Sequence, residues 1–171
     1  MSLFCKFVDS PVGQLRLVAS EQGLVAVLWE NDDPLRVRLN PTAEDAAHPV
    51  LLRAESELRE YFAGEREIFT IPLDLRGTHF QKQVWGALLA IPFGETRTYG
   101  QLARMLGNPN ASRAVGLANR CNPVSIIVPC HRVIGSSGSL TGFAGGLDAK
   151  AHLLAFESRG RIPVSMQLKL G

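Results

Sequence analysis

The sequence predicts an α+β fold, in which a small N-terminal sheet with one helix precedes a mostly helical C-terminal part. Runs with the two-residue alternation or the β-branched content of strands gather in the first thirty residues. From about residue 50 onward, apolar residues mainly recur at the three- and four-residue spacing of helices. The character of the 171-residue chain changes near Gly77, so we expect two domains, residues 1–76 and 77–171.

The first domain opens with a predicted β-meander. Leu15, Leu17 and Ala19 alternate with polar or exposed positions, and residues 23–29 form a second apolar, β-branched run. Turn-forming residues lie on either side of the first run. The polar stretch of residues 31–49 holds three prolines, which predicts a loop or a mobile linker.

A helix is expected next, and it ends at Gly64. The apolar positions that define this helix are Leu51, Ala54, Leu58 and Tyr61. Residues 71–75 follow as a short predicted strand, which completes the first domain.

Three helices begin the second domain. Thr78 is the expected N-cap of the first. The apolar positions of the first two helices are Phe80, Val84, Leu88 and Ile91, then Tyr99, Leu102, Ala103 and Leu106. The third helix begins near Ala111 and ends by Asn122, because Pro123 disfavours a helical conformation in the residue before it. The Gly-containing turn at residues 107–110 makes the last two a helix-turn-helix pattern, which an ordinary helical hairpin would also produce.

The rest of the chain surrounds a cysteine motif. Residues 125–128 are a candidate buried strand, Pro129-Cys130-His131-Arg132 follows at once, and residues 135–146 form a loop rich in Gly and Ser. A final helix spans about residues 147–157. Its expected apolar face is Leu147, Ala151 and Leu154, with Glu157 at the edge of that face.

Charge is distributed unevenly along the chain. Five of the 18 basic residues and none of the 16 acidic residues lie between Thr96 and Leu147. The five are Arg97, Arg104, Arg113, Arg120 and Arg132. Such a segment would attract a polyanion such as a nucleic acid, although chance clustering on a solvated surface would give the same pattern.

The predicted third helix presents two different faces. Arg113, Gly116 and Arg120 share one face, and Val115 and Ala118 lie on another. Glycine in a helix interior costs about 1 kcal/mol relative to alanine. Close approach of another backbone, such as DNA, is one reason for this cost to be tolerated.

The cysteine motif favours nucleophilic chemistry. A thiol attacks as its thiolate, which a nearby imidazole or arginine stabilises. The alternative is that Cys130 fills space at the end of a buried strand. On an extended chain His131 would point to the opposite face, so a bridging water or a sharp turn would be needed for it to act on the sulfur. Papain-like peptidases differ, because their Cys and His are distant in sequence.

Other features bear on compartment and cofactors. No apolar run approaches the ~18 residues of a membrane-spanning helix, and the N-terminus lacks the apolar region of a secretory signal. The three cysteines have no disulfide-like spacing, which favours reduced thiols in a cytoplasmic protein. No Cys or His pair has the spacing of metal ligands, so we expect no metal site.

Several segments together resemble one known family. In chain order they are Thr98-Tyr99-Gly100-Gln101-Leu102-Ala103, Arg113-Ala114-Val115-Gly116, Asn122-Pro123-Val124, Pro129-Cys130-His131-Arg132-Val133 and Gly145-Gly146-Leu147. They resemble the O6-alkylguanine-DNA alkyltransferases, also called methylated-DNA–protein-cysteine methyltransferases. The resemblance is strong over residues 78–157 and looser over 1–76, where it rests on Asp9-Ser10-Pro11 and Tyr61-Phe62-Ala63-Gly64. It implies a ribonuclease H-like N-terminal domain and a C-terminal domain that carries the site.

The resemblance also implies a reaction and its residues. The alkyl group would pass irreversibly from O6-alkylguanine in DNA, and also from O4-alkylthymine, onto Cys130 after nucleotide flipping. Through a water, His131 would act as the general base, and Glu157 would orient and charge the imidazole. Asn122 would brace the turn that holds the site. Tyr99 would help rotate the nucleotide out and supply a proton to the guanine oxygen.

The same resemblance implies a DNA surface and an alkyl pocket. Arg113 would be the finger that enters the duplex in place of the flipped nucleotide. The other expected DNA-binding residues are Tyr99, Ser112, Gly116 and Arg120. The residues expected to border the alkyl pocket are Phe143, Ala144 and Gly145. This chain departs from many members at Phe143, where tyrosine is common, and at His152, where tryptophan is frequent. Cys121 is an unusual neighbour of the site and a candidate second reactive thiol.

Other classes of function compete with this interpretation. A lesion sensor of the alkyltransferase-like kind would lack the acceptor, which Cys130 supplies. A helix-turn-helix regulator without chemistry would leave Cys130, His131 and Glu157 unexplained and would usually dimerise. A cysteine hydrolase is a more distant alternative. We therefore expect a protein that is monomeric without DNA, binds double-stranded DNA containing alkylated guanine, needs no cofactor and contacts no membrane.

Overall fold

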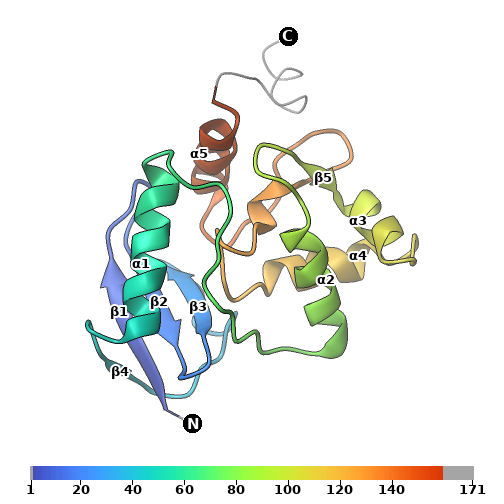
Figure 1. The fold of residues 1–171 in the computed structure, drawn as a ribbon. Helices are drawn as coiled ribbons and strands as arrows, with labels where there is room; N and C mark the ends of the chain where they lie inside the picture. Colours follow the sequence, from blue (N-terminus) through green and yellow to red (C-terminus); the bar gives the residue numbers. More distant parts are fainter. Residues whose placement is uncertain (1, 160–171) are drawn as a thin grey trace. The chain divides into compact units, whose positions relative to one another are not determined.

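The computed structural model describes residues 2–159 (Figure 1), and these form two compact units. The first contains the residues up to Arg76 together with Pro123–Ile127, and the second contains Gly77–Asn122 together with the described residues from Val128 onward. Residues 123–127, which were expected in the second domain, belong to the first unit. The end of that predicted domain, residues 160–171, lies outside the described residues.

A four-stranded sheet with the order β3-β2-β1-β4 organises the first unit. Its strands are β1 (Leu3–Val8), β2 (Leu15–Ala19), β3 (Leu24–Trp29) and β4 (Thr42–Glu44). The β1–β2 and β2–β3 pairs are antiparallel, so the predicted β-meander is confirmed. The fourth strand corrects the sequence analysis, which predicted a loop throughout residues 31–49. Thr42–Glu44 pairs in parallel with the first residues of β1, a non-local pairing that short-range patterns do not reveal.

The strand predicted at residues 71–75 is not formed. Leu73 makes an isolated bridge to Leu24, and the backbone bonds around it join Leu24 N to Pro72 O and Asp74 N to Leu24 O. Pro72 has no N–H to continue a ladder, which keeps the contact to a single bridge.

Helix α1 (Pro49–Phe62) lies across one face of the sheet (Figure 1). The apolar residues predicted for this helix are all buried: Leu51, Ala54, Leu58 and Tyr61. Its Glu57 is also buried and accepts hydrogen bonds from the backbone N–H groups of Thr70 (2.9 Å) and Ile71 (3.1 Å). Burial alone would raise the pKa of Glu57, but these bonds and those from the Thr70 hydroxyl and Arg53 hold it below its usual value. Glu57 therefore fastens the returning chain to α1.

The segment 125–128, predicted as a buried strand, is a buried turn. Val124 bridges Val27 of β3, and Ser125 Oγ accepts a hydrogen bond from Trp29 Nε1 at 3.1 Å. Ile126 has a φ of +74°, a left-handed conformation that is strained for a β-branched residue. Tertiary contacts therefore override the β-branched character of this segment.

The second unit is mainly helical. Its helices are α2 (His79–Leu89), α3 (Tyr99–Met105), α4 (Ser112–Arg120) and α5 (Leu147–Glu157), and a 3-10 turn covers Cys130–Arg132. A two-stranded parallel sheet joins β5 (Arg97–Thr98) to β6 (Val133–Ile134). The predicted N-cap Thr78 is confirmed, and both Thr78 and Thr98 form reciprocal capping boxes. With one small sheet domain and one helical domain, the predicted α+β class is confirmed.

Helix α4 matches its predicted pattern and ends at Arg120, before Asn122 as expected. Val115 and Ala118 are buried, whereas Arg113 and Arg120 are exposed. The helices α3 and α4 pack together and are joined by residues 106–111, where Gly107 takes a φ of +76°. The predicted helix-turn-helix pair is therefore formed, and its polar face is open to solvent.

Helix α5 has the predicted bounds but a different buried face. Leu147 is exposed and Ala151 is half-buried. The buried residues are Ala149, Lys150, Leu153, Leu154 and Glu157. The predicted apolar face was correct at Leu154 and wrong at Leu147 and Ala151. The buried face includes the charged Lys150 and Glu157, which a pattern of apolar residues does not reveal.

Candidate active site

Cys130 is the first residue of the 3-10 turn and is buried. Its backbone N–H donates to Val128 O at 2.8 Å, and Asn122 Nδ2 donates to the same carbonyl at 2.8 Å. One carbonyl thus connects the end of α4 to the cysteine turn, which is the bracing geometry expected for Asn122. The premise of an extended chain at Cys130 was wrong, since successive residues of a 3-10 turn differ by about 120° in direction.

His131, Arg132 and Glu157 form a buried charged network. His131 Nε2 lies 2.7 Å from Glu157 Oε2. Arg132 donates from Nε to Glu157 Oε1 at 2.7 Å and from Nη2 to Oε2 at 2.9 Å, and its Nη1 donates to Ile91 O at 2.6 Å. Glu157 is 2% exposed, so it is not the helix-end surface charge that its position in the sequence would suggest. Both of its oxygens are occupied, and the bidentate arginine fixes the plane of the carboxylate.

The network fixes the charges of its members. Burial alone would raise the pKa of Glu157, but its interactions with His131 and Arg132 outweigh burial and hold that pKa far below its usual value. Burial lowers the pKa of His131, and the charges of Arg132 and Lys150 reinforce this against the attraction of Glu157. At neutral pH the site therefore holds a carboxylate beside a neutral imidazole.

These charges determine the tautomer of His131. Because Glu157 is an anion with no proton to give, Nε2 must carry the hydrogen of the 2.7 Å contact. The lone pair is then on Nδ1, which is buried and has no hydrogen-bond partner among the described residues. A neutral imidazole with an open basic nitrogen is the state that a general base requires.

Lys150 is a buried cation in the site that the sequence analysis missed. It is completely buried, and its Nζ donates to Val133 O at 2.6 Å and to Thr141 O at 3.2 Å. Burial lowers the pKa of Lys150 to about 8, and the charge of Cys130 acts in the opposite direction. Its position seven residues before Glu157 on the same helix was the available signal, because this spacing puts both on one face.

Replacing Lys150 by methionine should make the Cys130 thiolate harder to form. Methionine keeps most of the length and volume but removes the ammonium, which favours a nearby thiolate. We expect the rate of Cys130 alkylation by iodoacetamide at pH 7 to fall about tenfold, and its pH profile to shift upward. The exposed lysine Lys82 is the matched control, and Lys82→Met should leave the profile unchanged. Identical profiles for Lys150→Met and the unmodified protein would contradict the role of Lys150.

Tyr99 and Gly116 lie together on the helix pair. The Tyr99 hydroxyl is hydrogen-bonded to Thr141 Oγ1 at 2.7 Å. A Cβ added to Gly116 would meet the Tyr99 ring at 3.6 Å, an ordinary contact, so nothing within residues 2–159 demands glycine there. The approach of an external backbone to Gly116 stays a prediction.

The arginines of the basic segment occupy different environments. Ser112 and Arg113 begin α4 and are exposed, as are Arg104 and Arg120. Arg132 is buried against Glu157, so its inclusion in a DNA-attracting surface was wrong. The external positive face of this segment therefore depends on α3 and α4.

The predicted pocket loop lies before α5. Its members Phe143, Ala144 and Gly145 are all half-buried. Within residues 2–159 no group of three or more His, Cys, Asp or Glu side chains has a metal-binding arrangement. No helix in that part of the chain combines the length and apolar character needed to cross a membrane. The catalytic and DNA-contact roles of the individual side chains stay predictions.

Comparison with known proteins identifies the family. Residues 3–75 match the 6-O-methylguanine DNA methyltransferase ribonuclease-like domain, and residues 79–159 match the DNA-binding domain of the same enzymes. The methylated-DNA–protein-cysteine methyltransferase of Mycobacterium tuberculosis is 47% identical over 163 residues, which cover 94% of this chain and 95% of the relative. The chain belongs to the methylated-DNA–protein-cysteine methyltransferase family. The member from Methanosarcina acetivorans is also 47% identical, over 91% of this chain and 98% of its own.

Solved methyltransferase structures agree with this assignment. The crystal structure of Mycobacterium tuberculosis O6-methylguanine methyltransferase has a TM-score of 0.82 and 46% identity, covering 98% of this chain and 99% of the other. The structure of Mycobacterium tuberculosis OGT in complex with DNA also has a TM-score of 0.82, with 44% identity over 99% of both chains.

Proposed function

We propose that this methyltransferase repairs alkylated DNA by moving the alkyl group of O6-alkylguanine onto Cys130, once per protein molecule. The observation that carries the proposal is the buried pair formed by His131, which follows Cys130 in the sequence, and Glu157. His131 Nε2 lies 2.7 Å from Glu157 Oε2. It supplies a neutral imidazole whose open nitrogen can take a proton from the thiol through a water. O4-alkylthymine is included as a second substrate because its alkyl carbon has the same kind of bond to a base oxygen.

The transfer needs one bond made and one broken. The Cys130 thiolate attacks the alkyl carbon, the bond from that carbon to the guanine oxygen breaks, and its electron pair goes to the base. A proton from Tyr99 neutralises the departing guanine. The product is a thioether, which is a poor leaving group. Repair therefore consumes the protein.

DNA binding is assigned to the exposed face of α4. The N-cap residue Ala111 supplies no side-chain acceptor, so the N–H groups of the first helical turn, which begins at Ser112, can face a phosphate. Arg113 and Arg120 add positive charge on the same helix. Because the alkyl carbon is buried in the base stack, the nucleotide must rotate out, and Arg113 would fill the gap that it leaves. Phe143, Ala144 and Gly145 would then border the pocket that receives the base.

The competing functions are less well supported. A lesion sensor does not need the acceptor Cys130, and a regulator does not need a buried His131–Glu157–Arg132 network. We place the protein in the cytoplasm because a reducing compartment keeps an acceptor thiol intact. We also propose that it is a monomer without DNA. None of the three cysteines, Cys5, Cys121 and Cys130, forms a disulfide within residues 2–159.

The direct test is transfer of labelled methyl from a duplex oligonucleotide that contains O6-methylguanine. Label should appear on the protein in a second-order reaction and stop at one equivalent. Release of label to solvent, or continued turnover beyond one equivalent, would exclude the proposed reaction.

Arg113→Ala should slow repair of duplex DNA by about tenfold to a hundredfold, because extruding a base costs a few kcal/mol. The reaction with free O6-methylguanine base should change little, since the free base needs no extrusion. Rates on both substrates provide the measurement. Arg104→Ala removes another exposed arginine from the helix pair and is the matched control. Equal losses on duplex and free base would argue against a finger role for Arg113.

A further inference from the structure

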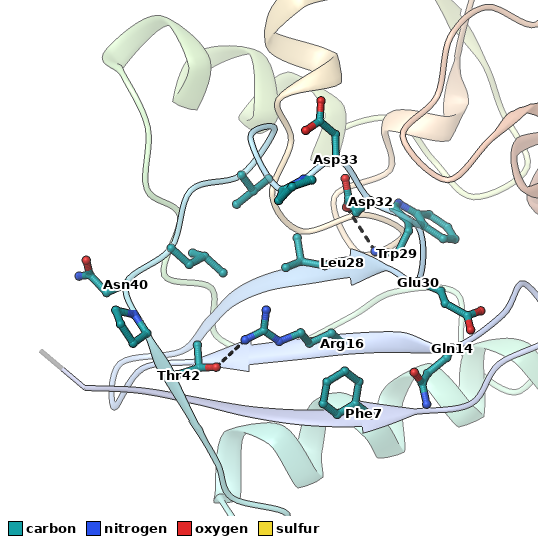
Figure 2. A pocket seen from close by; sticks show the side chains of 14 residues that line it. Phe7, Gln14, Arg16, Leu28, Trp29, Glu30, Asp32, Asp33, Asn40 and Thr42 are labelled. Carbon is teal, nitrogen blue, oxygen red and sulfur yellow. Dashed lines mark hydrogen bonds between the residues drawn. The ribbon is translucent and has the colours of Figure 1, made fainter.

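The first unit contains a cavity of about 400 Å³ that the alkyl-transfer reaction does not use. It lies between the sheet face opposite α1 and the segment that leads into β4 (Figure 2). Its floor is a cross-strand row in which Phe7 of β1, Arg16 of β2 and Leu28 of β3 are in register. Cavities of this size are typical of small-molecule sites.

Arg16 puts a cation in an otherwise apolar part of the sheet. Its strand neighbours Leu15 and Leu17 are completely buried on the other face. Toward the cavity, one terminal nitrogen, Nη2, donates to Thr42 Oγ1, and Thr42 in turn donates to Cys5 Sγ at 3.4 Å. This chain of bonds holds the guanidinium in one orientation. The other terminal nitrogen points away from Thr42 (Figure 2).

The guanidinium has most of its hydrogen-bonding capacity unused. It carries five N–H donors, and its Nε is buried with no hydrogen-bond partner among residues 2–159. A buried donor without a partner costs about 1–3 kcal/mol. An anion in the cavity would pair with the N–H donors of the terminal nitrogens that Thr42 leaves unused.

Three acidic residues line the cavity, yet none forms an ion pair with Arg16 within the described chain. Asp32 is held by Arg36, at 2.7 and 2.6 Å, and Asp33 accepts the Leu35 N–H at 2.9 Å. In Figure 2 the carboxylates of Glu30 and Asp33 lie at the edges and point away from Arg16. The acidic rim would repel a polyanion such as DNA, whereas a single charge can reach the central guanidinium.

Several apolar side chains also line the cavity, beside the polar Gln14 and Asn40. Phe7 is 47% exposed, and Leu28, Leu39 and Trp29 lie on the same cavity. An apolar group placed over Phe7 would bury surface that is now in contact with water. The site therefore pairs one fixed cation with an apolar surface.

From these features we propose that the N-terminal domain binds a small monocarboxylate with an apolar body, whose carboxylate pairs with Arg16 and whose body covers Phe7 and Leu28. The ligand is a monoanion because the rim is acidic, and a carboxylate because it can accept two parallel hydrogen bonds from a guanidinium. This site is separate from Cys130 and needs no alkylated DNA.

Benzoate is the probe for this site, observed through the Nε–Hε signal of Arg16 in ¹H–¹⁵N spectra of the full chain. Benzoate should shift this signal and those of Phe7 and Leu28 in a saturable way. Arg16→Gln should weaken binding at least tenfold, while Arg38→Gln, which removes an exposed arginine outside the cavity, should not. Arg16→Gln should retain alkyl transfer, which also reports that the variant is folded.

Uncharged and cationic analogues decide the outcome if Arg16→Gln fails to fold. Benzyl alcohol should bind much more weakly than benzoate to the unmodified protein, and benzamidine should not shift the Arg16 signal. Phe7→Ala should weaken benzoate severalfold. Linear shifts without saturation, equal binding of benzyl alcohol, or tighter binding of benzamidine would each overturn the proposal.

Discussion

After reaction with methylated duplex DNA, peptide mapping should find one added methyl group, and it should be on Cys130. Replacing Cys130 by serine should abolish transfer altogether, because a hydroxyl is a far weaker nucleophile than a thiolate at neutral pH. Binding to the lesion should persist in this variant, since the exposed arginines of α4 are untouched. The comparison of transfer with binding separates loss of the acceptor from loss of the fold.

The two other thiols provide the controls for this result. Cys121 is half-buried at the end of α4, and Cys5 is buried in β1, where its sulfur accepts a hydrogen bond from Thr42. Cys121→Ser and Cys5→Ser should each keep transfer at one equivalent. Methyl found on Cys121 would show that the site uses a different acceptor, and that the His131–Glu157 pair serves another purpose.

Local sequence signals predicted most of the elements of the fold. Thr78 was predicted as an N-cap because it precedes an apolar pattern of helical spacing, and its reciprocal bonds with Gln81 confirm that role. Pro123 limited α4 for a similarly local reason. The failures were non-local: β4 exists through its pairing with β1, and the segment that contains Ile126 is held by contacts with β3. The periodicity of a sequence does not reveal contacts between residues that are distant in sequence.

The candidate site was predicted only in part for a related reason. Cys130 and His131 were singled out by the cysteine motif, whereas the role of Glu157 came from a family resemblance, and the structure brings His131 and Glu157 into contact. Arg132 was assigned to a DNA-facing surface and Lys150 was overlooked. Charged side chains are normally solvated. Arg132 is stabilised in the interior by Glu157 and the Ile91 carbonyl, and Lys150 by the Val133 carbonyl, partners that are distant in sequence. Their burial could not be read from composition or spacing.

Replacing Glu157 by glutamine should affect both stability and transfer. Glutamine keeps the size of the side chain but leaves the buried Arg132 without its counter-charge, and breaking a buried ion pair costs about 3–5 kcal/mol. His131 also loses the anion that would stabilise it once it takes up a proton. We expect transfer by the folded variant to slow at least tenfold, and iodoacetamide alkylation of Cys130 to require higher pH.

Glu57→Gln is the matched control, because Glu57 is also a buried, hydrogen-bonded glutamate but lies in the first unit. It should lower the free energy of unfolding by about 1–3 kcal/mol without slowing transfer under conditions where the protein is folded. If Glu157→Gln slowed transfer no more than Glu57→Gln, its role would be structural and the proposed relay would be incorrect.

The pH dependence of stability gives an independent readout of Glu157. Its pKa in the folded state lies below the ordinary value of 4.5, so its stabilisation is complete above pH 4.5 and is lost as the pH falls further. His131 affects stability at higher pH, because its folded-state pKa lies below 6.5. As the pH falls below 6.5, His131 takes up a proton in the unfolded chain before it does so in the folded protein, and the free energy of unfolding therefore declines. In urea unfolding, the unmodified protein should therefore weaken from about pH 6.5 downward. The gap between it and Glu157→Gln should close only below pH 4.5. A gap that closed already near pH 6 would mean that the carboxylate of Glu157 is protonated far more easily than its contacts with Arg132 and His131 imply.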